Sequence, residues 1–500
     1  MLFNSYAFLL FFLPATLAGW FAFGRWAGLR WAQVWLVAAS LFYYGWWNPW
    51  YLILIVGLTL ANYGWGRELA GKAFQGLPRG WALAVGLVVN LCVLGYFKYA
   101  NFFVDNADAL LGANWVLAKV ILPLGISFFT FQKIGYLVDC SRGLVPKGDF
   151  LNFALFVVFF PQLIAGPITH HGEVIPQFSK EGVTRPQAEN LAVGSTMLIF
   201  GLAKKVLLAD PLSERIGTTF SAAADGSHLS LSIAWYGVLA YALQLYFDFS
   251  GYTDMAIGLA RMFNITLPQN FNSPYQSANI VDFWRRWHMT LSRFLRDYLY
   301  FPLGGNRHGH FRRYVNLMVT MLLGGLWHGA NWTFAAWGLL HGFYLAANHA
   351  WLEAKTHIGV LAKVPRPLRI AGARGLTFVA VLAGWVLFRS KDFSSAAHLF
   401  HELVNFGGNS TAIITGAPRP ERWAWLGVLY LVVFFAPNTQ DILSGFHPVL
   451  GVKEASRHHG LCGGRLLWSP ESRWAIFCAV VFTACLLSLS NVTEFLYYQF

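Results

Sequence analysis

Residues 231–247 read LSIAWYGVLAYALQLYF, a run without one charged side chain. A helix that crosses the hydrocarbon core of a bilayer needs about 20 such residues, and fewer if it is re-entrant or enclosed by protein. Similar runs recur along the chain, and they predict an all-α protein with about ten to thirteen transmembrane or re-entrant helices. The other runs are residues 2–23, 34–56, 81–97, 121–137, 150–164, 191–202, 317–327, 332–347, 376–388, 425–435 and 475–489.

The composition agrees with this interpretation. Of the 500 residues, 56% are hydrophobic and only 12% are charged, whereas a soluble domain carries about 25% charged residues. So few charges cannot cover a water-exposed surface, which excludes an ordinary soluble protein. We interpret residues 1–500 as one membrane-embedded domain. The net charge of +13 indicates cytoplasmic loops near anionic lipids rather than nucleic-acid binding, because the basic residues lie between apolar runs.

The distribution of basic residues predicts the orientation in the membrane. Arg25 and Arg30 follow the first apolar run, and basic loops favour the cytoplasm. The N-terminus is therefore expected outside. Arg67 and Arg79, after two further crossings, are expected on the cytoplasmic side again, and residues 105–108 on the outer side.

Residues 282–298 read DFWRRWHMTLSRFLRDY, which predicts an amphipathic interfacial helix. At about 100° per residue, the arginines and aspartates gather on one face and the aromatic and aliphatic residues on the other. His288 lies at the border of the aromatic face. Two interpretations stay open from spacing alone: a membrane-surface anchor with an incidental histidine, or a histidine held against an internal site.

Residues 322–348 read LLGGLWHGANWTFAAWGLLHGFYLAAN, an apolar segment with His328 near its start. Its glycines allow close helix approach or a helix break. On a continuous helix His328, Asn331 and Trp332 would share a face. Burial keeps an imidazole neutral, as a general base requires. A core histidine that bonds a neighbouring helix is the equally weighted alternative.

Two further polar groups were considered. Asp248, within QLYFDFSGYTD at residues 244–254, needs a partner at membrane depth, and we expect an arginine near residues 285–296 or a histidine to supply it. His170, His171 and Glu173 suggest a metal site, but we interpret them as a polar loop and expect no metal. The five cysteines show no zinc-ligand spacing and are expected to pack as small apolar residues.

Several long motifs, in order along the chain, carry a family resemblance. They include FYYGWWNPWYL, LPLGISFFTFQKIGYLVD, FFPQLIAGPI, YFDFSGYTDMAIG, NFNSPY, DFWRRWHMTLSRFLRDYLYFPLGGNR, LLGGLWHGANWTFAAWGLLHG and GWVLFR. With them the sequence resembles the membrane-bound O-acyltransferase superfamily. It is most similar to the bacterial branch of alginate O-acetylases, acetylated-cellulose acyltransferases and the teichoic acid D-alanyl transfer protein.

The resemblance implies a multi-pass inner-membrane enzyme whose helices surround a central tunnel. His328 in WHG matches the family's essential histidine, and His288 in RRWH matches the second histidine of this branch. Trp327, Asn331, Asp248, Arg285 and Arg286 match motif positions of supporting or substrate-binding residues.

The implied reaction moves acetyl groups from a cytoplasmic donor, expected to be acetyl-CoA, toward an exopolysaccharide such as alginate or cellulose. No tightly bound cofactor is expected. The implied partners are periplasmic polysaccharide-acetylation proteins, the polymer itself and membrane lipids. The alternatives are teichoic acid D-alanyl transfer, a transporter of acyl or glycan groups without chemistry, and an assembly scaffold.

Overall fold

The computed structural model describes residues 1–71, 78–112, 115, 117–145, 148–354, 364–406, 418–451, 466–489 and 496. Within these residues the regular structure is helical, and the β-pairing is a single isolated bridge between Pro268 and Leu450. The prediction of an all-α fold is therefore confirmed.

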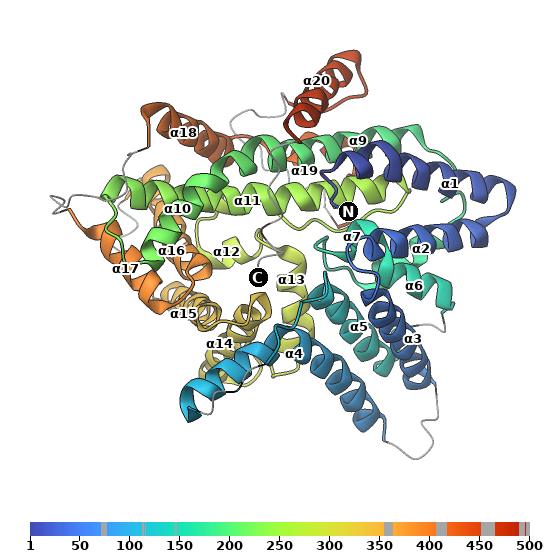
Figure 1. Ribbon diagram of the computed structural model, residues 1–500, viewed down its shortest axis with the longest axis horizontal. Coiled ribbons are helices and arrows are strands. Elements are labelled where there is room, and N and C mark those ends of the chain that lie inside the picture. The colour runs from blue at the N-terminus through green and yellow to red at the C-terminus, as the bar shows by residue number, and fades with distance from the viewer. Residues whose placement is uncertain are drawn as a thin grey trace.

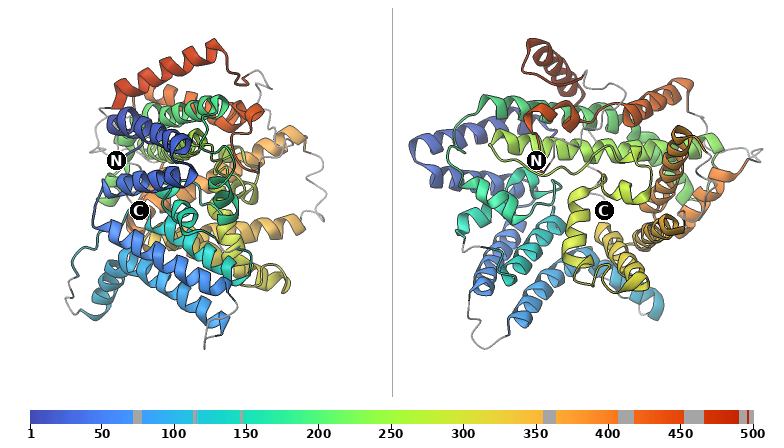
Figure 2. Two further views of the ribbon diagram at one scale, coloured as in Figure 1. Left: turned by 90° about the vertical axis from the view of Figure 1, so that its right-hand side faces the viewer. Right: turned by 180° about the vertical axis from the view of Figure 1, so that it is seen from behind.

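The helices follow the apolar runs of the sequence (Figures 1 and 2). Up to residue 224 they are α1 (Leu13–Trp26), α2 (Leu29–Gly45), α3 (Tyr51–Ala70), α4 (Arg79–Leu111), α5 (Ile126–Ser141), α6 (Phe150–Val158), α7 (Phe160–Leu163), α8 (His171–Phe178), α9 (Ala188–Ala203) and α10 (Ser213–Ala224). Beyond it they are α11 (Leu231–Met262), α12 (Ile280–Trp284), α13 (Met289–Leu295), α14 (Gly309–His328), α15 (Trp332–Ala354), α16 (Arg366–Arg389), α17 (Phe393–Val404), α18 (Pro420–Phe435), α19 (Thr439–Ile442) and α20 (Ser472–Ser488).

Helix α11, which contains the opening sequence run, is the central element of the molecule. It is buried on all sides along most of its length, so protein rather than lipid surrounds it. Helix α9 runs beside it (Figure 1), and glycines permit the contact. A Cβ atom added at Gly201 would lie 2.5 Å from the Gly251 carbonyl oxygen, and one at Gly194 would lie 2.6 Å from that of Gly258. Small residues at such spacing allow membrane helices to approach backbone to backbone.

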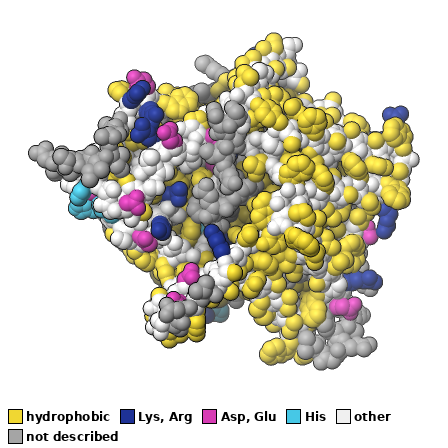
Figure 3. Space-filling view, viewed as in Figure 1, with side chains coloured by type: hydrophobic (Ala, Val, Ile, Leu, Met, Phe, Trp, Pro, Cys, Tyr) yellow, Lys and Arg dark blue, Asp and Glu magenta, His cyan; other side chains and the backbone are white. Residues whose placement is uncertain are grey.

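The outer surface is that of a membrane protein. Large apolar side chains such as Phe11, Trp26 and Trp81 are exposed, and Figure 3 shows hydrophobic side chains covering much of the right-hand half of the molecule. Such a surface would be unstable in water but is suited to lipid. Within the described residues, four helical segments are long and apolar enough to cross a membrane: Ala7–Trp26, Arg79–Leu111, Ala188–Ala224 and Arg366–Arg389.

The expectation of ten to thirteen helices also included re-entrant ones, and the fold divides several apolar runs. Residues 150–164 form the short helices α6 and α7, which meet at Phe159. Residues 317–347 are split between α14 and α15 after His328. The breaks at Phe159 and His328 are buried in protein, where irregular backbone can be satisfied at membrane depth.

The predicted continuous helix over residues 282–298 is wrong. Helix α12 ends at Trp284, and His288 takes a left-handed conformation with φ of +43° before α13 begins. The backbone groups released there bond the preceding loop: Met289 N–H donates to the Asn270 carbonyl and Asn272 N–H to that of Arg286, each at 2.9 Å. The aromatic face of the segment packs into the protein core, so it is not a lipid anchor.

Candidate active site

His288 sits at the break between α12 and α13 and is completely buried. Its Nδ1 atom lies 3.1 Å from Asn270 Oδ1. The same Oδ1 atom accepts hydrogen bonds from the Thr290 backbone N–H at 3.3 Å and from Thr290 Oγ1 at 2.9 Å. The backbone donor identifies this amide atom as an oxygen.

This assignment fixes the tautomer of His288. Since Asn270 Oδ1 can only accept, Nδ1 of His288 carries the proton and donates it to that oxygen. Nε2 therefore presents its lone pair. It is buried and has no hydrogen-bond partner in the described part of the chain. A buried imidazole with one nitrogen anchored and the other available has the arrangement of a catalytic base or hydrogen-bond acceptor.

His328 ends α14 in an aromatic enclosure. Its ring centroid is 5.0 Å from that of Trp327, 5.2 Å from those of Trp337 and Phe388, and 6.4 Å from that of His288. The helix ends before Gly329, where only glycine fits, because a Cβ atom there would collide with the Phe334 ring. The structure thus brings together the two histidines that lie forty residues apart in sequence.

Trp327 and Lys98 support this histidine pair. The Trp327 ring stacks on Phe131 at 5.3 Å and lies 6.0 Å from the His288 ring. From α4, Lys98 Nζ donates hydrogen bonds to the carbonyl of Trp327 and, at 3.1 Å, to that of His328. These carbonyls belong to the last turn of α14, where a cation is favourable because it opposes the helix dipole.

A cavity of about 660 Å³ opens on one side of the pair. Met289 and Thr290, which follow His288, contribute to its wall, and so do four arginines: Arg285, Arg293, Arg296 and Arg313. Three of the arginines are held by carboxylates: Arg293 makes two bonds to Glu173, Arg296 pairs with Asp297, and Arg313 lies 3.8 Å from Glu353. Arg285 is exposed, with no ion pair to a described residue. This basic cavity suits an anionic ligand.

A second cavity, of about 310 Å³, lies on the other side. Lys98 and Phe128 line it, together with residues 122–127 and the N-terminal Met1 and Leu2. The described residues leave only about 10 Å³ of space beside His328 itself. Residues next to His288 line the larger cavity, and Lys98, which bonds the His328 carbonyl, lines the smaller one, so the histidine pair adjoins both cavities. The central tunnel implied by the resemblance stays a prediction.

Three predicted site residues have other partners. Asn331 lies outside α14, where its Nδ2 atom donates to the Lys391 carbonyl at 2.7 Å and its Oδ1 atom accepts from Thr333 N–H at 3.0 Å. The prediction that Asn331 shares a helix face with His328 was wrong, because α14 ends before Asn331. Arg286 bonds Asp282 at 2.9 Å and does not line the basic cavity.

Asp248 pairs with neither an arginine of residues 285–296 nor a histidine, so that expectation was wrong. Its partner is Lys205, with Nζ 2.6 Å from Oδ1, and it also accepts the backbone N–H of Leu496 at 3.0 Å. Asp248 therefore ties Leu496 to α11. Its chain neighbour Phe249 contacts His288, with ring centroids 4.9 Å apart.

Sequence reasoning missed two residues of the site. Asn270 begins the NFNSPY motif, which was used only for the family resemblance, although its position shortly before the histidine segment was a usable signal. Lys98 is a lone charge within the apolar run of α4, which is a functional indication at membrane depth. Its partner carbonyls lie more than two hundred residues away, so spacing could not reveal them.

Comparisons with known proteins agree with this geometry. The family model described as "MBOAT, membrane-bound O-acyltransferase family" matches residues 8–361. The chain is 42% identical to the peptidoglycan O-acetyltransferase of Helicobacter pylori over 82% of its own length and 81% of that protein. It is 39% identical to a protein of Azotobacter vinelandii named "probable alginate O-acetylase AlgI", with both chains covered completely.

A teichoic acid D-alanyltransferase of Bacillus subtilis is more distant, at 28% identity over 55% of this chain and 70% of that protein. The family match covers both histidine segments and all the walls of the two cavities apart from Met1, Leu2, Leu450 and Gly451. The chain therefore belongs to the membrane-bound O-acyltransferase family, and it is a membrane-embedded acyltransferase.

Proposed function

We propose that this protein is a multi-pass acyltransferase of the bacterial inner membrane that acetylates an exopolysaccharide, alginate or a similar polymer. The observation that carries the proposal is the buried histidine pair between two cavities, one of them lined by arginines. The full-length similarity to a protein named as an alginate O-acetylase supports the choice of polymer.

In the proposed reaction a polymer hydroxyl attacks the carbonyl carbon of an acetyl thioester. His328 takes the hydroxyl proton as the new C–O bond forms. The tetrahedral intermediate then expels the thiolate, which receives that proton, so the products are an acetyl ester and a free thiol. His288, with Nδ1–H held by Asn270, orients the acceptor through the lone pair of Nε2, which accepts a hydrogen bond.

The proposed donor is acetyl-CoA, used as a substrate rather than as a tightly bound cofactor. Its phosphates are anionic, and the basic cavity offers Arg285 without a competing described carboxylate, and Arg313 at the same wall. Guanidinium groups bind phosphate oxygens through paired charge-assisted hydrogen bonds. The acceptor would enter through the smaller cavity, directly or through periplasmic partner proteins.

A second candidate acceptor is peptidoglycan, favoured by the 42% identity to the Helicobacter pylori enzyme of that name. Peptidoglycan and alginate both present sugar hydroxyls outside the inner membrane, so the same site chemistry serves either. Teichoic acid D-alanyl transfer is less favoured, because that similarity covers only part of the chain.

The test compares His328→Ala with His310→Ala in a strain that lacks the native gene. Both histidines lie on α14, but the His310 side chain is largely exposed and outside the cavities. Mass analysis of ester-linked acetate in secreted polysaccharide and in isolated peptidoglycan identifies the acceptor. We expect His328→Ala to abolish acetylation and His310→Ala to preserve it, at equal amounts of membrane-inserted protein. Normal acetylation in His328→Ala would exclude the catalytic proposal and favour a conduit or scaffold.

A further inference from the structure

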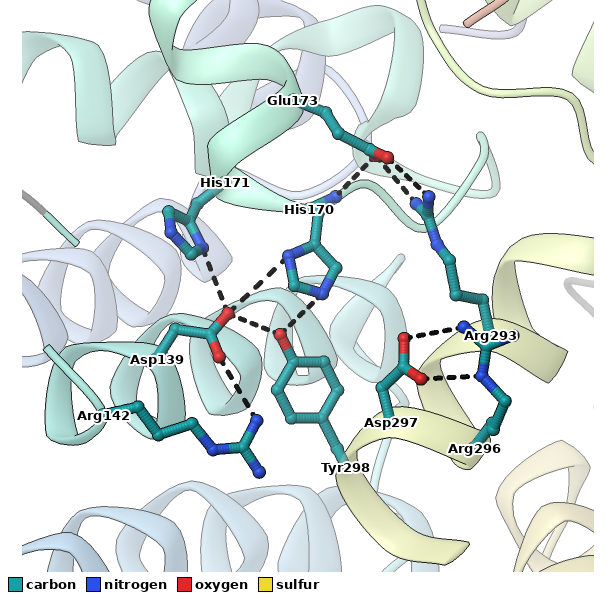
Figure 4. A network of polar contacts seen from close by, with 9 residues as sticks. All are labelled: Asp139, Arg142, His170, His171, Glu173, Arg293, Arg296, Asp297 and Tyr298. Atoms are coloured by element: carbon teal, nitrogen blue, oxygen red, sulfur yellow. Dashed lines mark hydrogen bonds and ion pairs between the residues drawn. The ribbon is translucent and has the colours of Figure 1, made fainter. Parts of the chain in front are cut away.

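A polar cluster lies apart from the histidine pair, at the end of α5 and the start of α8 (Figure 4). It contains Asp139, His170 and His171. Oδ2 of Asp139 is 3.6 Å from Nδ1 of His170 and 3.4 Å from Nδ1 of His171. Donor atoms of all three side chains lie within 4.8 Å of one another. Asp139 and His171 are buried, and His170 is about one-third exposed.

Tyr298 constrains the proton positions in this cluster. Its hydroxyl lies 2.6 Å from Asp139 Oδ2 and 2.7 Å from His170 Nε2. A carboxylate can only accept, so the tyrosine donates its single proton to Asp139. The tyrosine oxygen must then accept a proton from Nε2 of His170. A neutral His170 consequently presents the lone pair of Nδ1.

That lone pair faces the carboxylate oxygen of Asp139 at 3.6 Å. Two acceptors turned toward each other in a buried place repel unless a positive charge lies between them. Either a proton or a metal cation can supply this charge. The positively charged neighbour Arg142 approaches the other oxygen, Oδ1, also at 3.6 Å, so it does not fill the space between Oδ2 and the two imidazoles.

The separations favour a metal cation. An N–H···O hydrogen bond has its most frequent length at about 2.9–3.0 Å, which is shorter than either imidazole–carboxylate distance here. In a tetrahedral zinc site with bonds of about 2.0–2.1 Å, neighbouring ligand atoms lie roughly 3.3 Å apart. The observed 3.4 and 3.6 Å are close to that edge. Two imidazoles and one carboxylate are also a common ligand set for catalytic zinc and related ions.

Space and outer contacts complete the site. A cavity of about 10 Å³ is lined by His170, His171 and Tyr298, which is close to the room that one water molecule needs as a fourth ligand. The bond from His170 Nε2–H to Tyr298 is the outer-shell contact that usually orients a metal-bound histidine. The backbone N–H of His170 is 3.5 Å from Glu173, which in turn binds Arg293 of the basic cavity (Figure 4).

We propose that Asp139, His170 and His171 form a binding site for one divalent transition-metal ion, with zinc as the best match to the ligands. The ion would join α5 to the segment that begins α8, and through Glu173 and Arg293 it would fix one wall of the basic cavity. The proposal is independent of the acetylated polymer and of the donor. On sequence spacing we expected no metal here, because Asp139 is too far along the chain to be associated with the two histidines.

The test uses the full chain, purified in detergent with a tag that contains no histidine and stripped with a chelator. Added Co²⁺ serves as the spectroscopic probe, and Zn²⁺ content is measured by mass spectrometry after desalting. We expect about one equivalent of metal and the visible absorption of tetrahedral cobalt. Asp139→Asn and His171→Ala should each reduce metal affinity at least about tenfold. The control variants His310→Ala and His398→Ala should leave metal affinity unchanged. Tyr298→Phe should keep the stoichiometry while weakening affinity roughly 10- to 100-fold.

The wild-type measurement decides the question even if a variant fails to fold. A stripped wild-type protein that takes up no cobalt and no zinc would overturn the proposal, and a shared proton between His170 and Asp139 would then account for the geometry. Metal binding that is equal in wild type, Asp139→Asn and His171→Ala would overturn it as well, because the ion would then lie elsewhere.

Discussion

At the scale of single residues, Asn270 is the group that determines which nitrogen of His288 is available. Replacing it with alanine removes the acceptor of the Nδ1 proton, so the ring can rotate or exchange tautomers. We expect Asn270→Ala to lower kcat for acetyl transfer about 10- to 100-fold, in the range for loss of a group that orients an active-site histidine. KM for the donor should change little, since Asn270 does not line the basic cavity.

The measurement is thiol release from acetyl-CoA by the purified protein with an oligosaccharide acceptor. Asn270→Asp retains an oxygen acceptor and should recover part of kcat, which a merely space-filling role would not explain. Equal loss of kcat in both variants, with unchanged thermal stability, would contradict the orienting role.

At the scale of helices, the contact between α9 and α11 depends on glycine. A Cβ atom at Gly201 would lie 2.5 Å from the Gly251 carbonyl oxygen, and the two backbones cannot separate without disturbing the central helix. We expect Gly201→Ala to destabilise the protein by about 1–3 kcal/mol, as overpacking of a tight core does. Gly217→Ala on α10 is the matched control, because no atom lies within 4 Å of its added Cβ.

Thermal unfolding in detergent, followed by tryptophan fluorescence, measures this difference. The control should match wild type or exceed it slightly, since alanine favours helix over glycine. If Gly201→Ala unfolds at the wild-type temperature, the helices are not packed as closely as described here.

The helices also mark the limit of sequence reasoning. Apolar runs predict them well, because burial or lipid contact along a whole segment leaves a clear compositional signal. Breaks within a segment leave a weaker compositional signal. His288 is not glycine, so its left-handed conformation has no local signature. The hydrogen bonds that the backbone N–H groups of Met289 and Thr290 donate to Asn270 hold it. Asn331 appeared to share a face with His328 only because the helix end at Gly329 was not assigned.

The candidate site, too, could be predicted only in part from the sequence. His328 and His288 were identified through long motifs, and the fold places their rings together. Their neighbours Lys98 and Asn270, and the association of Asp139 with His170 and His171, depend on which helices pack against each other. Such partners are distant in sequence and carry no spacing pattern. Asp248 shows the same limit, because the sequence argument required a cationic partner but could not single out Lys205 among the possible ones.

At the scale of the whole molecule, the proposal requires the two cavities to open on opposite sides of the membrane. Hydrogen bonds and ion pairs connect helix ends that the sequence predicts to lie on the same side of the membrane. Arg79 donates to the carbonyls of Leu69 and Cys140, and Arg30 pairs with Asp149, so each pair links basic and neighbouring segments of the end that the sequence predicts to be cytoplasmic. At the other end, Tyr51 bonds the Ile121 carbonyl, next to the residues that line the smaller cavity.

Cysteine labelling tests this two-sided arrangement. Arg312 lies on α14 near its start and Asp105 lies on α4 near its end, and both are exposed. In a background without native cysteines, a membrane-impermeant maleimide should label Asp105→Cys in cells with a permeable outer membrane and an intact inner membrane. Arg312→Cys should be labelled only after the inner membrane is opened, because basic loops stay in the cytoplasm. Labelling of both positions from one side would place donor and acceptor cavities in the same compartment, and the transfer across the membrane proposed for the histidine pair would then be untenable.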